Sequence, residues 1–300
     1  MDYRTLSGYL LETFGTKVYK LSLVTGCTCP NRDGTAGTGG CTFCSAGGSG
    51  EFAAPLLPVS EQIRVAKQRV DRKFPRNIAP ENRRYIAYVQ SYPNTYGDPE
   101  VLLDMFQDAI SFPEIAALSI GTRPDCLDEP VLSMLSSLNR QKPVWVELGL
   151  QTIHEKTAAA VNRGYSLNVF EQSYRRLKEQ GLTVIVHLIL GFPQETREDM
   201  LDSVRYLAAL NPAPDGVKLQ QLQILRGTAL AEEYAADPFP LMTLEEYADL
   251  ITDCLRLLPK ETVVHRITGD GPKRLLVAPL WCADKKRVLN TLYRKIRDAV

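Results

Sequence analysis

The sequence lacks an apolar run long enough to cross a membrane. Its longest mainly apolar stretch, residues 182–192, is interrupted by His187 and is far shorter than the roughly 20 residues that a membrane-spanning helix needs. The amino terminus, MDYRTLSGYLLETFG, also lacks the basic start and the apolar core of a secretory signal. We therefore expect a cytoplasmic protein that is not embedded in a membrane.

The chain also has no excess of either charge, because 35 lysines and arginines balance 35 aspartates and glutamates. Basic side chains nevertheless gather in two segments, residues 64–84 and 261–300. These segments are expected to be either solvated helix faces or a positive surface for a polyanion such as RNA. The seven cysteines are an odd number, and four of them lie in one loop, which favours a metal in a reducing compartment over a disulfide scaffold.

That loop is rich in glycine, and three of its cysteines have the spacing C-x11-C-x2-C: Cys29, Cys41 and Cys44. Two thiolates three residues apart can bind one metal centre, and the flexible, almost entirely polar span lets the third approach from outside. Three thiolates on a cubane iron–sulfur cluster leave one iron without a protein ligand, and that iron can bind a small molecule. The pattern therefore indicates chemistry more than electron storage.

Cys27 leaves other interpretations open. The longer pattern C-x-C-x11-C-x2-C could supply four sulfurs to a closed tetrahedral zinc site. The Cys-x-x-Cys pair alone would fit a redox dithiol, and the cysteines could also be inert. The choice depends on the rest of the chain.

Strands and helices alternate along the sequence. This alternation predicts a parallel sheet with crossover helices, because parallel strands need long connections. No Gly-x-Gly-x-x-Gly motif follows the first strand, so nothing supports an open dinucleotide-binding sheet. The six expected strands, each followed by helical segments, cover residues 17–24, 84–90, 115–121, 144–151, 182–190 and 217–225.

The fourth expected strand indicates a polar interior. Period-two alternation puts Glu147, Gly149 and Gln151 on one face and two leucines on the other. The leucines must meet the helix layer, so the polar face points inward. An unpaired carboxylate there would be strongly unfavourable, and Glu147 is therefore either paired, with Arg123 and Lys218 as candidates, or in contact with a ligand. Polar groups on other strands favour a ligand-holding cavity.

Five motifs together resemble the radical S-adenosylmethionine (SAM) enzymes. They are the cysteine loop, Glu147-Leu-Gly-Leu-Gln151, Asn162-Arg163-Gly164, Leu190-Gly-Phe-Pro193 and Arg226-Gly227-Thr228. The chain is most similar to the YhcC/YtqA type, which is itself similar to the radical domain of the Elongator catalytic subunit. The resemblance implies an α/β fold, a partial (β/α)6 TIM-like barrel. We expect this barrel at residues 17–260, after an amino-terminal helix at 1–16 and before a carboxyl-terminal extension at 261–300 that packs on it.

The resemblance further implies that Cys29, Cys41 and Cys44 hold a [4Fe–4S] cluster whose open iron binds SAM. Reductive cleavage of SAM would then give a 5′-deoxyadenosyl radical, with the electron coming from a flavodoxin- or ferredoxin-like donor. Cys27 would be a spare thiol. In the extension, His265, Arg266 and Asp270 would form a structural lid or touch substrate.

SAM contacts are expected at positions that match the family. Gln151 can bond ribose hydroxyls or the methionyl amine, and Arg163 can meet the methionyl carboxylate. Asn94 or Thr95 could bond the same amine or simply form a turn, and Phe43 would pack near adenine. The candidate cofactor-binding residues are Phe43, Asn94, Thr95, Arg123, Glu147, Gln151, Arg163 and His187.

The expected function is that of a radical SAM enzyme. Similarity to the Elongator radical domain and the two basic segments favour modification of transfer RNA at or near a wobble uridine. The alternative, a small-molecule or peptide substrate, is favoured by the zero net charge. A third interpretation, from another class, is a zinc-stabilised RNA-binding module without catalysis.

Overall fold

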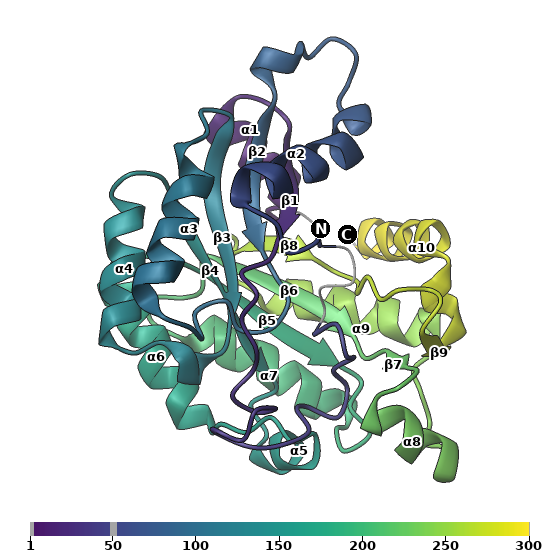
Figure 1. The fold of residues 1–300 in the computed structure, drawn as a ribbon. Coiled ribbons are helices and arrows are strands. Elements are labelled where there is room, and N and C mark those ends of the chain that lie inside the picture. The colour runs from purple at the N-terminus through teal and green to yellow at the C-terminus, as the bar shows by residue number, and fades with distance from the viewer. Residues whose placement is uncertain (1–2, 49–52, 300) are drawn as a thin grey trace.

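The protein is described by a computed structural model that covers residues 3–48 and 53–299 (Figure 1). Met1 and Asp2 of the predicted amino-terminal segment and Val300 of the predicted extension lie outside the described residues. Over the described ranges, the main sheet has seven strands, all parallel, in the order β1-β2-β3-β4-β5-β6-β8. These strands are β1 (Val18–Leu23), β2 (Arg84–Val89), β3 (Ile115–Thr122), β4 (Val144–Gln151), β5 (Thr183–Leu190), β6 (Gly216–Gln221) and β8 (Val263–Arg266).

Helices on the outside of the sheet connect the strands (Figure 1). Several begin at a residue whose side chain accepts from a backbone N–H of the first turn, and Thr196 and Thr243 form full capping boxes. The α-helices are α1 (Leu6–Phe14), α2 (Val59–Val70), α3 (Pro99–Ser111), α4 (Glu129–Asn139), α5 (Glu155–Ala160), α6 (Leu167–Glu179), α7 (Arg197–Ala209), α8 (Ala229–Ala236), α9 (Leu244–Leu257) and α10 (Lys285–Asp298). Short 3₁₀ helices lie at Asp71–Lys73, Pro80–Asn82, Pro124–Cys126 and Leu280–Ala283.

The predicted α/β partial barrel is confirmed, with one strand more than the six expected. Residues Val263–Arg266, assigned from sequence to the extension, form β8 and pair with β6. The last expected strand is also divided. β6 ends at Gln221, and Leu222 N–H donates to Leu190 O at 2.8 Å as the last bond of the β5–β6 ladder. β7 (Ile224–Leu225) then pairs antiparallel with β9 (Leu276–Ala278) in a small separate sheet.

Alternation along the strands sorts side chains between two layers, as period two requires. Leu148 and Leu150 of β4 are fully buried against the helix layer, in one cluster with Leu135 and Phe170. Glu147 points the other way, into the concave face of the sheet, where it meets side chains of β1, β5 and β6. The predicted inward direction of the polar face is therefore observed.

The amino-terminal end of this concave face is apolar. One buried side chain from each of five strands meets Leu10 of α1 in a separate cluster: Val18, Ile86, Ala117, Trp145 and Ile185. α1 is fixed there because Val264 of β8 donates its N–H to Arg4 O at 2.8 Å. The helix thus fills the bottom of the half barrel, and the polar residues lie above it.

Replacing Leu10 by Ala should lower the free energy of unfolding by about 2–3 kcal/mol, because it opens a cavity in this cluster. Leu11→Ala is the matched control, since the neighbouring Leu11 is 58% exposed, and its effect should stay within about 0.5 kcal/mol. Urea unfolding followed by circular dichroism measures both. Equal losses would mean that α1 does not close the barrel in the way described.

Candidate active site

A cavity lies where the cysteine loop faces the carboxyl ends of the strands. Its lining includes Cys29, Cys41 and Cys44. The other walls come from the ends of β2 to β5, which is where parallel α/β folds place their ligand sites. The strand-end residues that line it are Gln90, Ser91, Gly121, Thr122, Arg123, Glu147, Gly149, Gln151 and His187.

The three thiols are close enough to interact electrostatically. Burial, followed by the charge of Cys44, raises the pKa of Cys41 to about 12, and Arg123 opposes this rise. Within the described residues, no group of three His, Cys, Asp or Glu side chains is arranged to hold a single metal ion. A cubane cluster is bound at different iron corners, so its cysteine ligands need not converge on one point. Three thiols on one cavity wall are a donor set that such a cluster can take.

Cys27 lies away from this group. Its sulfur packs against the hydrophobic core, 3.3 Å from the position that a Cβ on Gly97 would occupy, and it does not line the cavity. Burial raises the pKa of its thiol. A tetrahedral zinc site would therefore lack its fourth sulfur, and the zinc interpretation is not supported.

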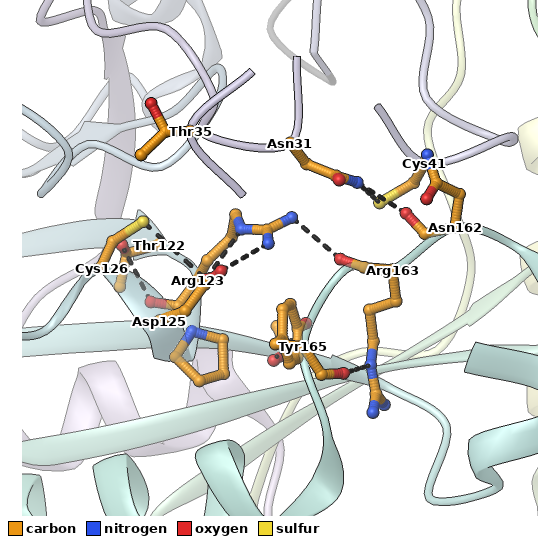
Figure 2. A network of polar contacts seen from close by, with 12 residues as sticks. Asn31, Thr35, Cys41, Thr122, Arg123, Asp125, Cys126, Asn162, Arg163 and Tyr165 are labelled. Atoms are coloured by element: carbon orange, nitrogen blue, oxygen red, sulfur yellow. Dashed lines mark hydrogen bonds and ion pairs between the residues drawn. The ribbon is translucent and has the colours of Figure 1, made fainter. Parts of the chain in front are cut away.

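Asn31 shows that the loop is built around the cysteine group. Its side chain is fully buried, donates to Asn162 O at 2.6 Å and faces Cys41 Sγ at 3.9 Å (Figure 2). Its Oδ1 is a buried acceptor without a partner in the described chain. A Cβ on Gly37 or Gly164 would come within 2.3 or 2.7 Å of that oxygen. Outer-shell N–H groups directed at ligating sulfurs are typical of iron–sulfur sites, so the residues fit the cluster.

The Asn162-Arg163-Gly164 turn fixes the loop to the sheet. Asn162 adopts a positive φ of 51° and donates its side-chain amide to Thr38 O at 3.0 Å and Gly40 O at 2.8 Å. The left-handed conformation is one that asparagine tolerates better than most residues. These bonds cross from the turn between α5 and α6 to the cysteine loop, which has no apolar core of its own.

Arg163 does not occupy the role predicted for it. Its guanidinium is fully buried and donates to Leu150 O at 3.0 Å, Thr152 O at 2.6 Å and Tyr165 O at 2.9 Å. Figure 2 shows it turned away from the cysteine loop. Bonded to three backbone carbonyls and paired with Glu155 at 3.5 Å, Arg163 holds the turn.

Asn94 and Thr95 are buried in the turn after β2 and are not among the residues that line the cavity. Asn94 is fully buried, donates to Gly121 O at 3.0 Å and accepts from Thr25 Oγ1 at 2.8 Å. Thr95 donates to Cys126 O at 2.6 Å. Both side chains satisfy the turn after β2, and the plain-turn alternative is the one observed.

Arg123 lines the cavity, but it does not pair with Glu147 as predicted. Its guanidinium makes two bonds to Asp125, at 2.6 and 2.9 Å, and donates to Arg163 O at 3.0 Å (Figure 2). Asp125 is two residues away on the same turn, so it reaches the guanidinium before any side chain across the barrel. Arg123 therefore supplies positive charge beside the cysteines.

Glu147 is instead held by residues from other strands. Its buried carboxylate pairs with Lys20 at 2.6 Å and with Lys218, and it accepts from Ser119 at 2.8 Å and from His187 Nε2 at 3.1 Å. The prediction of Lys218 as a partner is confirmed. Lys20 was missed, although its inward parity in β1 was readable once the first strand was assigned.

Burial and neighbouring charges shift the pKa values of Glu147, Lys218 and His187. Burial alone would raise the pKa of Glu147, but Lys20, Lys218 and the His187 bond hold it well below its usual range. Burial lowers the pKa of Lys218, against the effect of the carboxylate. Burial also lowers the pKa of His187, to about 4, so the ring is neutral at neutral pH. Glu147 is therefore the anion of this group.

Phe43 and Gln151 face the cavity, as predicted. Phe43 packs against Phe192 with ring centroids 5.8 Å apart. Gln151 has a positive φ of 65°, which is strained for a residue with a side chain and is typical of functional sites. Its Oε1 accepts from Tyr165 Oη at 2.7 Å.

Comparison with protein families identifies the family of the chain. The model of the Radical SAM superfamily matches residues 26–207, and that of the Radical_SAM C-terminal domain matches residues 214–298. The chain belongs to the radical SAM superfamily. It is therefore a radical SAM enzyme, and the superfamily implies a [4Fe–4S] cluster and SAM as cofactors.

The similarities predicted from the motifs are confirmed. The chain is 38% identical over 297 residues to YtqA of Bacillus subtilis (99% of this chain, 90% of YtqA) and 36% identical over 292 residues to YhcC of Escherichia coli K12 (97% and 91%). It is 31% identical over 178 residues to Elongator complex protein 3 of Schizosaccharomyces pombe, covering 56% of this chain and 32% of that protein.

Solved structures agree on the fold. The archaeal Elp3 of Methanocaldococcus infernus superposes with a TM-score of 0.67 at 19% identity, over 93% of this chain and 63% of that one. Coproporphyrinogen III oxidase of Escherichia coli, a radical SAM enzyme, gives a TM-score of 0.53 at 16% identity, over 85% and 56%. Among the described helices, none combines the length and apolarity needed to span a bilayer.

Replacing Glu147 by Gln should lower the free energy of unfolding at pH 7 by about 3–5 kcal/mol, because Lys20 would lose its buried anion. A depressed glutamate pKa stabilises the fold above the ordinary value of 4.5, so the difference from wild type should shrink as the pH falls below it. Urea unfolding at several pH values tests this.

The matched control is Glu129→Gln, because the Glu129 side chain is 72% exposed and pairs with Arg176 on the surface. Its effect should stay below about 1 kcal/mol. If both variants lose the same stability, or if the Glu147→Gln difference does not depend on pH, Glu147 is not the buried anion of the barrel.

Proposed function

We propose that Cys29, Cys41 and Cys44 bind the [4Fe–4S] cluster of this enzyme and that the cavity they line seats SAM. One observation supports this most: the three thiols line a single cavity with Gln151 and His187, while Cys27 packs elsewhere. When bound, the cluster supplies the electron that cleaves SAM reductively, and the resulting 5′-deoxyadenosyl radical abstracts a substrate hydrogen.

The residues of the cavity would bind and orient SAM in distinct ways. Phe43 offers an apolar face for the adenine ring, and Gln151 offers an amide to the ribose or the methionyl amine. Arg123 places positive charge where the methionyl carboxylate can use it. Because the Glu147 carboxylate accepts from His187 Nε2, the neutral ring keeps its proton there and leaves Nδ1 as an acceptor.

We further propose transfer RNA as the substrate, at or near a wobble uridine, in the cytoplasm, with a flavodoxin- or ferredoxin-like electron donor. The similarity to Elongator complex protein 3 supports the RNA substrate. Both basic segments contain a helix that presents exposed cations. On α2 and the segment after it these are Arg64, Arg69, Arg72, Lys73 and Arg76, and on α10 they are Lys286, Arg287, Arg294 and Arg297. Their spacing along helix faces suits contact with phosphates.

Cys41→Ala should lose the cluster, whereas Cys27→Ala should keep it, because only Cys41 lines the cavity with the other two thiols. Iron content and broad absorption at the blue end of the visible, measured after anaerobic purification, distinguish the two. Equal loss of iron in both variants would contradict the proposed ligand set.

Transfer RNA from cells without the gene should lack a modified nucleoside that wild-type cells contain. Comparison of nucleoside profiles by liquid chromatography and mass spectrometry measures this, and restoring the gene should restore the nucleoside. A gene carrying Cys41→Ala serves as the control and should not restore it. An unchanged profile would favour a small molecule or peptide, the alternative supported by the zero net charge.

A further inference from the structure

A second cavity adjoins the one that holds the cysteines. The two share four lining residues, Phe43, Cys44, Gln151 and His187. A molecule in the second cavity would therefore lie directly beside the proposed SAM site. Its remaining walls come from Ser45 of the cysteine loop, from the ends of β5, β6 and β8, from β7 and from the loop after β8. The polar side chains among them that matter here are Gln220, Gln221, Gln223, Arg266 and Asp270.

Amide side chains dominate the polar part of these walls. Gln221 fastens the loop after β8, because its Oε1 accepts from Gly269 N at 2.7 Å and its Nε2 donates to Cys282 Sγ at 3.1 Å. Gln220 Oε1 accepts from Arg266 Nη1 at 3.3 Å, which leaves the Gln220 amino group available. Gln223 approaches the Cys282 thiol and opposes the rise that burial gives the pKa of that thiol, and no described residue pairs with the rest of the Gln223 amide.

The loop after β8 is shaped to admit Gln223. A Cβ on Gly271 would lie 2.0 Å from Gln223 Oε1 and would displace this amide, and one on Gly269 would lie 3.4 Å from Nε2. The sequence Thr268-Gly-Asp-Gly-Pro272 therefore folds closely around this amide. The two glycines therefore leave room for the Gln223 amide, which packs against the loop.

Arg266 gives the cavity a positive charge. Among the described ion pairs it has no carboxylate partner, and the one carboxylate in the cavity, Asp270, pairs with Lys285 at 2.5 Å. His187 is neutral at neutral pH. The cavity thus combines a guanidinium, neutral amides and the aromatic ring of Phe43.

These groups match a nucleotide. Bases that proteins take out of a stack are hydrogen-bonded along their edges and packed on aromatic rings, and guanidinium groups pair with phosphates. Gln220 and Gln223 together leave two donor groups and one acceptor unpaired, and the edge of uracil offers two acceptors and one donor. We propose that the second cavity binds a uridine nucleotide, with the two amides on the base edge and Arg266 on a phosphate. This inference rests on the proposed function, because the proposed modification of a uridine is what makes a uridine the expected ligand. The binding site itself is argued from its own residues.

Binding to the SAM-loaded, cluster-containing enzyme tests the site. The probes are uridine 5′-monophosphate, cytidine 5′-monophosphate and an anticodon stem-loop RNA with uridine or cytidine at the wobble position, titrated anaerobically and followed by calorimetry or saturation-transfer NMR. The uridine forms should bind more tightly than the cytidine forms. Gln223→Glu and Arg266→Gln should each weaken uridine binding about tenfold, by removing a donor to the base and the cation for the phosphate.

Two surface variants on α6 serve as matched controls, Gln172→Glu and Arg175→Gln, because both residues are exposed. They should leave binding unchanged. Thermal unfolding identifies any variant that is merely unfolded, and because Gln223 and Arg266 lie on different segments, one of the two changes remains informative.

The possible outcomes distinguish a failure of the nucleotide site from a failure of the proposed transfer RNA substrate. If the stem-loop binds and the cavity variants weaken its binding, the nucleotide in the cavity is part of an RNA. If only the free mononucleotide binds and the same variants weaken it, the site stands and the RNA substrate falls. If the stem-loop binds wild type and both variants equally, the cavity assignment is overturned and the RNA substrate stands. Equal binding of uridine and cytidine probes, or binding of neither, also overturns it.

Discussion

The structure depends on one buried carboxylate whose ion pairs connect distant strands of an open barrel. In the described chain β1 and β8 are the two edges of the sheet and do not pair with each other, so backbone bonds do not close the curve. Glu147 on β4 reaches Lys20 on β1 and Lys218 on β6 instead. An ion pair in an apolar interior is unfavourable unless it is fully bonded, and here Ser119 and His187 complete the set. The same bonds keep the concave face polar above the apolar layer that Leu10 closes.

The cysteine loop presents the opposite problem, because it has almost no apolar side chains with which to pack. Its position comes from hydrogen bonds to the turn after α5, made by Asn31 and Asn162. Arg163 stiffens that turn by bonding three carbonyls. A polar loop held by a rigid turn can place three thiols on the wall of a cavity without a core of its own.

Alternation was enough to predict the parallel sheet, the inward face of Glu147 and the facing of Gln151, and the resemblance of the motifs to a known family implied the half barrel. They were not enough to assign Arg163 and Asn94, whose donors are satisfied by carbonyls that come close only when distant turns fold together. β8 was missed as a strand because four residues carry too little pattern to separate a strand from a loop. The pairing of Arg123 with Asp125 shows that a neighbour on the same turn outcompetes a partner across the barrel.

The two cavities are lined by different parts of the chain, and this difference separates the cysteine loop from the residues of the second cavity. The cysteine wall lies within the region matched by the superfamily model, residues 26–207, and the amide wall lies within the carboxyl-terminal match, residues 214–298. Gln151 and His187 line both cavities at the junction. Changes at the ends of β6 and β8 can therefore alter what is bound without disturbing the cysteine loop or the Asn162 turn. Because His187 also bonds to Glu147, the ion pair that spans the barrel fixes the wall that the two cavities have in common.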